Sequence, residues 1–335
     1  MTEITTTDYH TGGEPFRIVT GGVVELEGRT VRERRRWAAA NLDHVRRLLV
    51  NEPRGHADMY GCFVTPPDDA NGDLGVVFFH NEGYSTACGH GTIALVTWAI
   101  ENGRVAVAAG ARVVDVTVDV PSGRLACTAR LADTGRVEAV RFRNVPSFVL
   151  ARDVEVQTSR GALALDVAFG GAFYGSIDVR ALGLGVEPTA LPELIAVQRE
   201  LRPALEQALK VVHPDQPDLG GIYGVIFWEP LDDEPRTQRN VTVFADGEVD
   251  RSPCGSGTSA RLAILHERGE IGIGETLRHR SIVDSIFDGR VLEPGPPIAG
   301  HPTIITEVEG AAFLTGHHTF SLDDRDSLGT GFSLR

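Results

Sequence analysis

A seven-residue pattern, Cys-Gly-x-Gly-Thr-x-Ala, occurs twice in the chain, at residues 88–94 and 254–260. A run typical of a buried strand precedes each copy, and a run typical of a helix follows it. This repeat limits the possible folds strongly, because duplicated flanks predict two matching halves built in the same way. Each half is expected to contain a strand, a glycine-rich turn and the start of a helix around one thiol.

Each copy of the pattern also predicts a binding site for an anion. The first turn of a helix presents free backbone N–H groups and the positive end of the helix dipole, which favour a carboxylate or a phosphate. The same environment lowers the pKa of a thiol. Two such sites facing each other would place Cys88 and Cys254 on opposite sides of one bound anion. A racemase needs this arrangement to remove a proton from one face of a carbon and return it to the other.

Burial as a small hydrophobic side chain is the alternative interpretation of any cysteine. The duplication with matched flanks favours the acid/base interpretation for Cys88 and Cys254. Cys62 and Cys127 have no such flanks, so we expect them to be packing residues without a role in chemistry.

Length and charge restrict the class of protein. A chain of 335 residues, 42% hydrophobic and 23% charged, is typical of a globular protein with two domains. Its net charge of −14 argues against nucleic acid and anionic membranes as partners, because such surfaces would repel it. The first residues show no signal-peptide pattern, and no apolar stretch reaches transmembrane length. Together with four irregularly spaced cysteines, these features predict a cytoplasmic protein with reduced thiols.

Cofactor chemistry is disfavoured by the residues that the chain lacks. Lys210 is the single lysine, and its charged helical surroundings are typical of a solvated face, not of a buried Schiff-base site. No His-Glu-x-x-His and no paired Cys-x-x-Cys pattern occurs. The pair of His56 and Asp58 is more typical of surface polar or hydrogen-bonded residues than of metal ligands, and the same holds for His317 and His318. We therefore expect a reaction that needs no metal and no cofactor.

Short strand patterns, separated by Gly, Pro and Asp turns, predominate over helical ones. They predict a duplicated α+β architecture with the active site in the cleft between the halves. The boundary is expected near Pro121, which gives halves of residues 1–120 and 121–324. Helical patterns cover residues 31–49, 92–102, 191–212 and 257–268. Strand patterns cover residues 17–26, 105–120, 125–131, 137–145, 222–227, 240–244 and 302–314.

Four motifs in a fixed order resemble those of the proline racemase family. They are HTGGEPFR at residues 10–17, EPRGHADMYG at 52–61, ACGHGTI at 87–93 and DRSPCGSGT at 250–258. The family contains proline racemases, 4-hydroxyproline epimerases and trans-3-hydroxy-L-proline dehydratases. The resemblance implies the diaminopimelate-epimerase-like fold, in which each half wraps a small barrel-like sheet around a central helix. It also implies that a C-terminal strand, expected at residues 325–335, completes the first half.

The resemblance further implies roles for particular residues. Cys88 and Cys254 would be the two acid/base thiols, and the substrate is expected to be a small molecule, proline or a hydroxyproline. A homodimer is compatible with the resemblance. The backbone N–H groups that would hold the substrate carboxylate are those of Gly89, His90, Gly255 and Ser256. The side chains that would assist the thiols or pack on the substrate ring are those of His90, Asp250 and Phe244.

The branch of the family is harder to assign. Dehydratases usually carry Thr in place of the second cysteine, so Cys254 favours a racemase or epimerase. Residues 54–60 and 222–225 are more similar to the racemase and dehydratase branches, because 4-hydroxyproline epimerases tend to have Ser at the position of His56. The sequence therefore predicts Cα inversion of proline or a hydroxyproline by two cysteines. Dehydration of trans-3-hydroxy-L-proline is the alternative, and a non-catalytic protein that binds imino acids is a third hypothesis.

Overall fold

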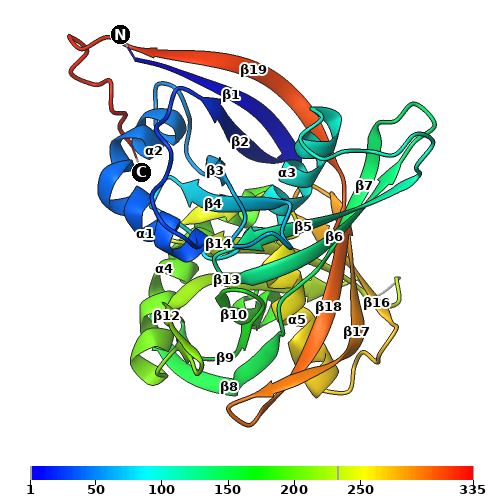
Figure 1. Ribbon diagram of the computed structural model, residues 1–335. Helices are drawn as coiled ribbons and strands as arrows, with labels where there is room; N and C mark the ends of the chain where they lie inside the picture. Colours follow the sequence, from blue (N-terminus) through cyan, green and yellow to red (C-terminus); the bar gives the residue numbers. More distant parts are fainter. Residues whose placement is uncertain (1, 232–233, 335) are drawn as a thin grey trace. The chain divides into compact units, whose positions relative to one another are not determined.

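The computed structural model of the protein describes residues 2–231 and 234–334 (Figure 1). The chain divides into two compact units, the first formed by Met1–Phe142 with Ala311–Arg335 and the second by Arg143–Gly310. The turn at Pro121, where the sequence suggested a boundary, connects two paired strands inside the first unit, with Val120 opposite Gly123.

In the first unit, strands from both ends of the chain pair with each other. β1 is antiparallel to both β2 and β19, so the blue and red strands of Figure 1 lie side by side. β2 also pairs in parallel with β3, and β3 pairs antiparallel with β4. The strands of this unit are β1 (Thr2–Thr11), β2 (Glu14–Gly21), β3 (Tyr60–Thr65), β4 (Leu74–His80), β5 (Val113–Val120), β6 (Gly123–Leu131), β7 (Val137–Arg143) and β19 (Ala312–Leu322). The helices are α1 (Val31–Asn41), α2 (Asp43–Val50) and α3 (Gly89–Glu101).

The strand that returns to the first unit is β19, which ends at Leu322. Residues 323–334 contain turns and a single bridge between Phe332 and Glu52. The sequence DDRD at residues 323–326 favours this ending, because the Asp323 and Asp326 side chains accept hydrogen bonds from N–H groups two residues further on.

In the second unit, β10 pairs in parallel with β13, and β13 is antiparallel to β14. The strands are β8 (Phe148–Thr158), β9 (Gly161–Phe169), β10 (Phe173–Asp178), β11 (Val212–His213), β12 (Gln216–Gly220), β13 (Ile222–Pro230), β14 (Thr237–Phe244), β15 (Glu248–Asp250), β16 (Thr276–Ser281), β17 (Ile286–Ile298) and β18 (His301–Gly310). The helices are α4 (Leu191–Ala208) and α5 (Gly255–Glu267), with short 3₁₀ turns at Val179–Leu182 and Pro188–Ala190.

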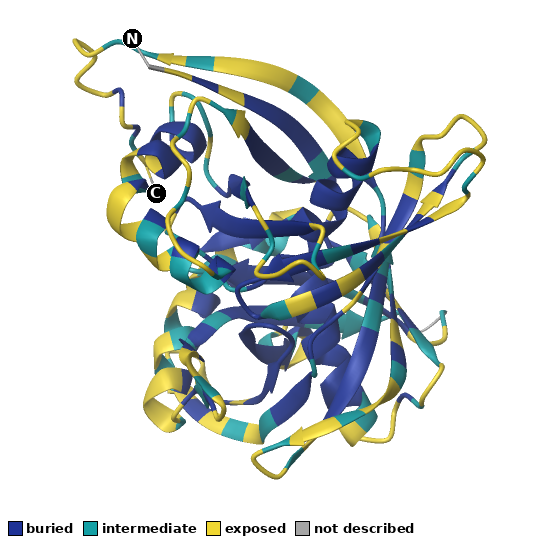
Figure 2. Cartoon of the chain, in the orientation of Figure 1, coloured by how far each residue is buried: buried dark blue, intermediate teal, exposed yellow. Residues whose placement is uncertain are grey.

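Each unit contains one helix surrounded by strands. All residues of α3 from Gly89 to Ile100 are buried, and this helix packs against β1, β2, β3, β6 and β19. All residues of α5 from Gly255 to Leu265 are buried too, and α5 packs against β8, β9, β10, β17 and β18. Figure 2 shows both helices in the colour of buried residues. A helix with small or apolar residues on all sides is stable only when strands surround it. The repeated pattern therefore marks the centre of each unit.

None of the helices in the described ranges combines the length and the apolar character that a membrane crossing requires.

Candidate active site

In the first unit, Cys88 begins α3 as its N-cap residue. Its Sγ atom accepts a hydrogen bond from the N–H of Gly91 at 3.2 Å, and the side chain is 6% exposed. A Cβ atom at Gly91 would lie 2.7 Å from this sulfur and 2.3 Å from the Phe16 ring. Glycine is therefore required here by the close approach of the thiol and the ring to the helix backbone.

The imidazole of His90 lies beside the Cys88 thiol. The Sγ atom is 3.5 Å from Nδ1 and 3.4 Å from Nε2 of His90. The ring is almost fully buried and meets Tyr60 edge-on, with ring centroids 4.9 Å apart. Burial lowers the pKa of His90 to about 3, so the imidazole is neutral at physiological pH. It can exchange a hydrogen bond with the thiol but does not attract a thiolate as a cation would.

Tyr60 also holds the turn that precedes Cys88. Its hydroxyl donates to Ser85 Oγ, and Ser85 Oγ donates to the Ala87 carbonyl at 3.3 Å. Tyr60 belongs to the second motif of the sequence, but no role was assigned to it. The signal that could have found it is an aromatic residue with a polar end inside a motif that otherwise consists of turn residues.

In the second unit, a chain of hydrogen bonds positions Cys254. Ser252 donates to Asp250 Oδ1 through both its N–H, at 2.8 Å, and its hydroxyl, at 2.7 Å. The N–H of Cys254 then donates to Ser252 Oγ at 3.1 Å. Cys254 has a φ of +64°, which is uncommon for a residue with a side chain, so these bonds hold the thiol in a strained turn.

The electrostatic environment of Cys254 favours the protonated thiol. Burial and, to a lesser degree, the Asp250 carboxylate raise its pKa to about 12, although the Gly257 N–H acts in the opposite direction. Burial likewise raises the pKa of Asp250 to about 6, although the hydrogen bonds from Ser252 lower this pKa. The lowering of the pKa that a helix start was expected to produce is therefore outweighed at Cys254 by desolvation.

This ionisation state predicts slow alkylation of Cys254. With a pKa of about 12, its thiolate fraction at pH 8 is on the order of 10⁻⁴, whereas a free thiol with a pKa of about 8.5 is roughly one-quarter ionised. Iodoacetamide should therefore label Cys254 at least about tenfold more slowly than free cysteine at pH 8. Asp250→Asn should accelerate labelling, because it removes a negative charge. Time-resolved peptide mapping by mass spectrometry measures both rates, and labelling of wild-type Cys254 at the rate of free cysteine would contradict the assignment.

A chain of three aromatic residues begins at the second thiol. The Tyr174 hydroxyl lies 2.7 Å from Ser256 Oγ and 3.8 Å from Cys254 Sγ. Tyr223 meets Tyr174 edge-on and stacks on Phe244, with ring centroids 5.2 Å apart and an interplanar angle of 10°. Phe244 was expected at the site, whereas Tyr174 was missed because it precedes Cys254 by 80 residues and has no motif of its own.

The predicted site residues thus form one group in each unit. Cys88, Gly89 and His90 lie together at the start of α3. Those of the second unit lie around the start of α5 and at the ends of β14 and β15, namely Phe244, Asp250, Cys254, Gly255 and Ser256. Within the described residues, no group of three or more His, Cys, Asp or Glu side chains is arranged to hold a metal ion. His318 lies 3.4 Å from the buried Asp8 carboxylate, and His56 is exposed.

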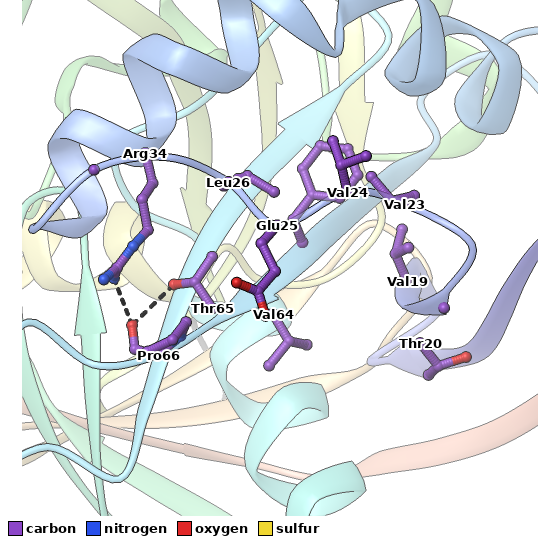
Figure 3. Close-up of a pocket in the computed structure, with 13 residues that line it drawn as sticks. Val19, Thr20, Val23, Val24, Glu25, Leu26, Arg34, Val64, Thr65 and Pro66 are labelled. Atoms are coloured by element: carbon purple, nitrogen blue, oxygen red, sulfur yellow. Dashed lines mark hydrogen bonds between the residues drawn. The ribbon is translucent and has the colours of Figure 1, made fainter.

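A cavity of about 370 Å³ in the first unit contains none of the predicted site residues (Figure 3). It lies between the segment after β2 and strand β3, and its wall combines apolar side chains, including Val19, Val24 and Phe63, with polar groups. Arg34 points away from the valines toward the Pro66 carbonyl and donates to it at 2.6 Å. Its guanidinium is thereby bound to the protein, and Glu25 is the other ionisable side chain among the residues that line the cavity.

Comparison with known proteins gives consistent matches over nearly the whole chain. A family model described as proline racemase matches residues 6–333. A trans-3-hydroxy-L-proline dehydratase of Bacillus thuringiensis subsp. konkukian is 45% identical over 333 residues, 98% of this chain and 98% of the relative. A 3-hydroxyproline 2-epimerase of Burkholderia multivorans is 45% identical over 336 residues, covering 99% and 98% of the two chains.

The fold has a close counterpart among solved structures. A hydroxyproline epimerase from Agrobacterium vitis, solved with bound trans-4-hydroxy-L-proline, superposes with a TM-score of 0.92 at 32% identity, covering 99% of this chain and 96% of the epimerase. The predicted fold class, a duplicated α+β fold of the diaminopimelate-epimerase type, is confirmed by this match and by the central helix in each unit.

Proposed function

This chain belongs to the proline racemase family, and we propose that it inverts the Cα configuration of a hydroxyproline or of proline by two-thiol proton transfer. One observation carries the proposal. In both units the glycine three residues after the cysteine lies against its sulfur, so that a Cβ at Gly91 or Gly257 would come within 2.7 or 2.9 Å of the respective Sγ. Each thiol therefore lies against the first turn of a buried helix, although the backbone at the two cysteines differs.

The protonation state of Cys254 assigns a first direction to the reaction. Because burial keeps Cys254 protonated in the free protein, it is the proton donor. The base that removes the Cα proton from the other face is then Cys88, which must first lose its own proton. The negative charge then moves from Cα into the substrate carboxylate, where helix N–H groups stabilise it. Cys254 delivers its proton to the opposite face, which leaves Cys88 as thiol and Cys254 as thiolate. Cys88 then releases its proton to solvent and Cys254 takes one up, which regenerates the starting state.

The relatives favour a 3-hydroxylated ring. The dehydratase and the epimerase that are each 45% identical to this chain both have 3-hydroxyproline in their names. The dehydratase name is also the observation that favours dehydration of trans-3-hydroxy-L-proline as the second candidate function. Both reactions begin with removal of the Cα proton. They differ afterwards, since dehydration expels the 3-hydroxyl as water, with a proton from an acid, and requires no proton from the opposite face.

An exchange experiment distinguishes the two functions. The protein is incubated in deuterated water with L-proline, both 4-hydroxyproline epimers or trans-3-hydroxy-L-proline, and the products are identified by NMR and chiral chromatography. We expect inverted product carrying deuterium at Cα from at least one ring, with trans-3-hydroxy-L-proline as the best substrate. Absence of Cα exchange with all four compounds would reject both functions and favour a protein that only binds imino acids.

We expect the activity to survive both the removal of metals and treatment with a carbonyl reagent. Exhaustive dialysis against EDTA and treatment with hydroxylamine should leave the inversion rate within about twofold of the untreated protein, because thiols alone transfer the protons. The single lysine, Lys210, is exposed on the loop after α4, which does not suit a buried Schiff-base site. Activity that is lost and then recovered only with zinc or pyridoxal phosphate would refute this expectation.

A further inference from the structure

A second cavity lies in the second unit, along α5 and away from Cys254. Its volume is about 250 Å³, and it is bounded by β9, β10, β13 and the C-terminal half of α5. None of the predicted site residues lines it. The residues that line it include Asp166, Ser176, Asp178, Trp228, Arg261 and Glu270.

Arg261 is a buried cation with unused donors. It is 2% exposed, its guanidinium lies 3.6 Å from the centre of the Trp228 ring, and its Nε donates to Gln238 Oε1 at 2.9 Å. In the described part of the chain, no acceptor takes a hydrogen bond from its two Nη groups. Burial lowers its pKa to about 10, so it is still charged at neutral pH. The Nη edge of a guanidinium is the shape that binds a carboxylate through two parallel hydrogen bonds.

Ser176 provides a second unused group in the same cavity. Its hydroxyl is buried, its residue is 4% exposed, and Oγ has no hydrogen-bond partner among the described residues. Buried polar groups are nearly always satisfied, so two such groups lining one cavity indicate that a polar molecule completes them.

The acidic side chains around the cavity restrict the charge of this molecule. Asp166 is bound by Arg268 at 2.8 Å, and Asp178 is bound by Arg180 at 2.6 Å, so neither neutralises Arg261 through a hydrogen bond. Glu270 stabilises the charge of Arg261 from a distance. A simple anion would be repelled by these carboxylates, and a simple cation would be repelled by the guanidinium. A molecule with one positive and one negative charge matches both the carboxylates and the guanidinium.

We propose that this cavity is a binding site for a small zwitterionic amino or imino acid. The carboxylate binds to the Arg261 Nη groups and Ser176 Oγ, and the ammonium group faces Asp178 and Glu270. The site is separate from the cysteines and does not depend on the reaction proposed for them. It lies on the helix that begins at Cys254 and on the strand that carries Tyr174, since Ser176 is two residues further along β10.

Isothermal titration calorimetry of the full-length protein tests this site with three probes. L-alanine is the zwitterion, acetate the anion alone and ethylammonium the cation alone. We expect saturable binding of L-alanine, with acetate and ethylammonium at least about tenfold weaker. Arg261→Met, Ser176→Val and Ala164→Phe should each weaken L-alanine binding at least about tenfold. Ala164 is exposed on the rim of the cavity, so its variant blocks the site without disturbing the core.

Arg278→Met is the matched control, because Arg278 is an exposed arginine of the same unit that pairs with Asp288 outside the cavity. It should bind L-alanine as the wild type does. Three results would overturn the proposal. The first is the lack of saturable L-alanine binding up to about 100 mM. The second is an equal affinity for L-alanine in the wild type and in the folded cavity variants. The third is acetate binding that is as tight as L-alanine binding. If Arg261→Met does not fold, Ala164→Phe decides between the outcomes.

Discussion

Cys88→Ser and Cys254→Ser are each expected to lower the rate of Cα inversion by at least about 100-fold while leaving the fold intact. A serine hydroxyl is too weak an acid to take part in proton exchange at Cα, and each thiol serves one face of the carbon. Cys127→Ala is a matched control, because Cys127 is a buried cysteine of β6 that lies outside both copies of the Cys-Gly-x-Gly-Thr-x-Ala pattern. Chiral chromatography gives the rates, and circular dichroism and thermal unfolding report on the fold.

A clear outcome would contradict the two-thiol proposal. If either serine variant keeps more than about one-tenth of the wild-type inversion rate, the thiol concerned is not required for proton transfer. If Cys127→Ala loses activity as strongly as the two serine variants while remaining folded, the effect cannot be assigned to the cysteines at the helix starts.

Cys254→Thr is expected to separate inversion from proton abstraction. It should abolish inversion of proline and the hydroxyprolines, because no thiol remains to protonate the second face. Exchange of the Cα hydrogen for deuterium should persist at the face served by Cys88, whose surroundings lie in the first unit and are unchanged. Dehydration of trans-3-hydroxy-L-proline, if the wild type performs it, should fall much less than inversion does. Proton NMR in deuterated water measures exchange and product formation in one sample.

The same experiment can reverse the ranking of the two functions. Wild-type protein that dehydrates trans-3-hydroxy-L-proline efficiently and inverts no proline would establish the dehydratase as the function. Cys254→Ser is the control for the strained backbone, because a β-branched threonine at a φ of +64° costs more than serine does. Loss of Cα exchange in Cys254→Thr but not in Cys254→Ser would indicate distortion of the turn, not loss of a thiol.

The central helices were predictable because their signal is local. The patterns at residues 92–102 and 257–268 correspond to α3 and α5, which begin three and two residues earlier, directly after their cysteines. The expected single helix at 31–49 is instead two helices. The Asn41 side chain donates to the Trp37 carbonyl, and Asp43 begins a new first turn after Leu42. Apolar periodicity continues through such a break, so it does not reveal the break.

Strands were less predictable because their partners lie far away in the sequence. β1 is rich in threonine and was not expected, and it is stabilised by β19, about 310 residues further on. The expected strand at 105–120 begins only at Val113, since the small residues before it have no pairing partner and Val107 is 41% exposed. At the site, Asp250 and Phe244 lie near Cys254 in the sequence, whereas Tyr174 is brought to the thiol by the packing of β10 against α5.

The pairing of β1 with β19 affects the order in which the protein can fold during synthesis. The ribosome releases β1 first, but β19 follows only after the entire second unit has been made. The second unit, by contrast, is one continuous segment and needs no strand from outside its own bounds. The first unit must therefore keep one edge of β1 unpaired until the end of synthesis, which makes this edge a segment that a chaperone could protect. A released chain that is truncated before Ala312 should accordingly give a protease-resistant second unit and a protease-sensitive first unit.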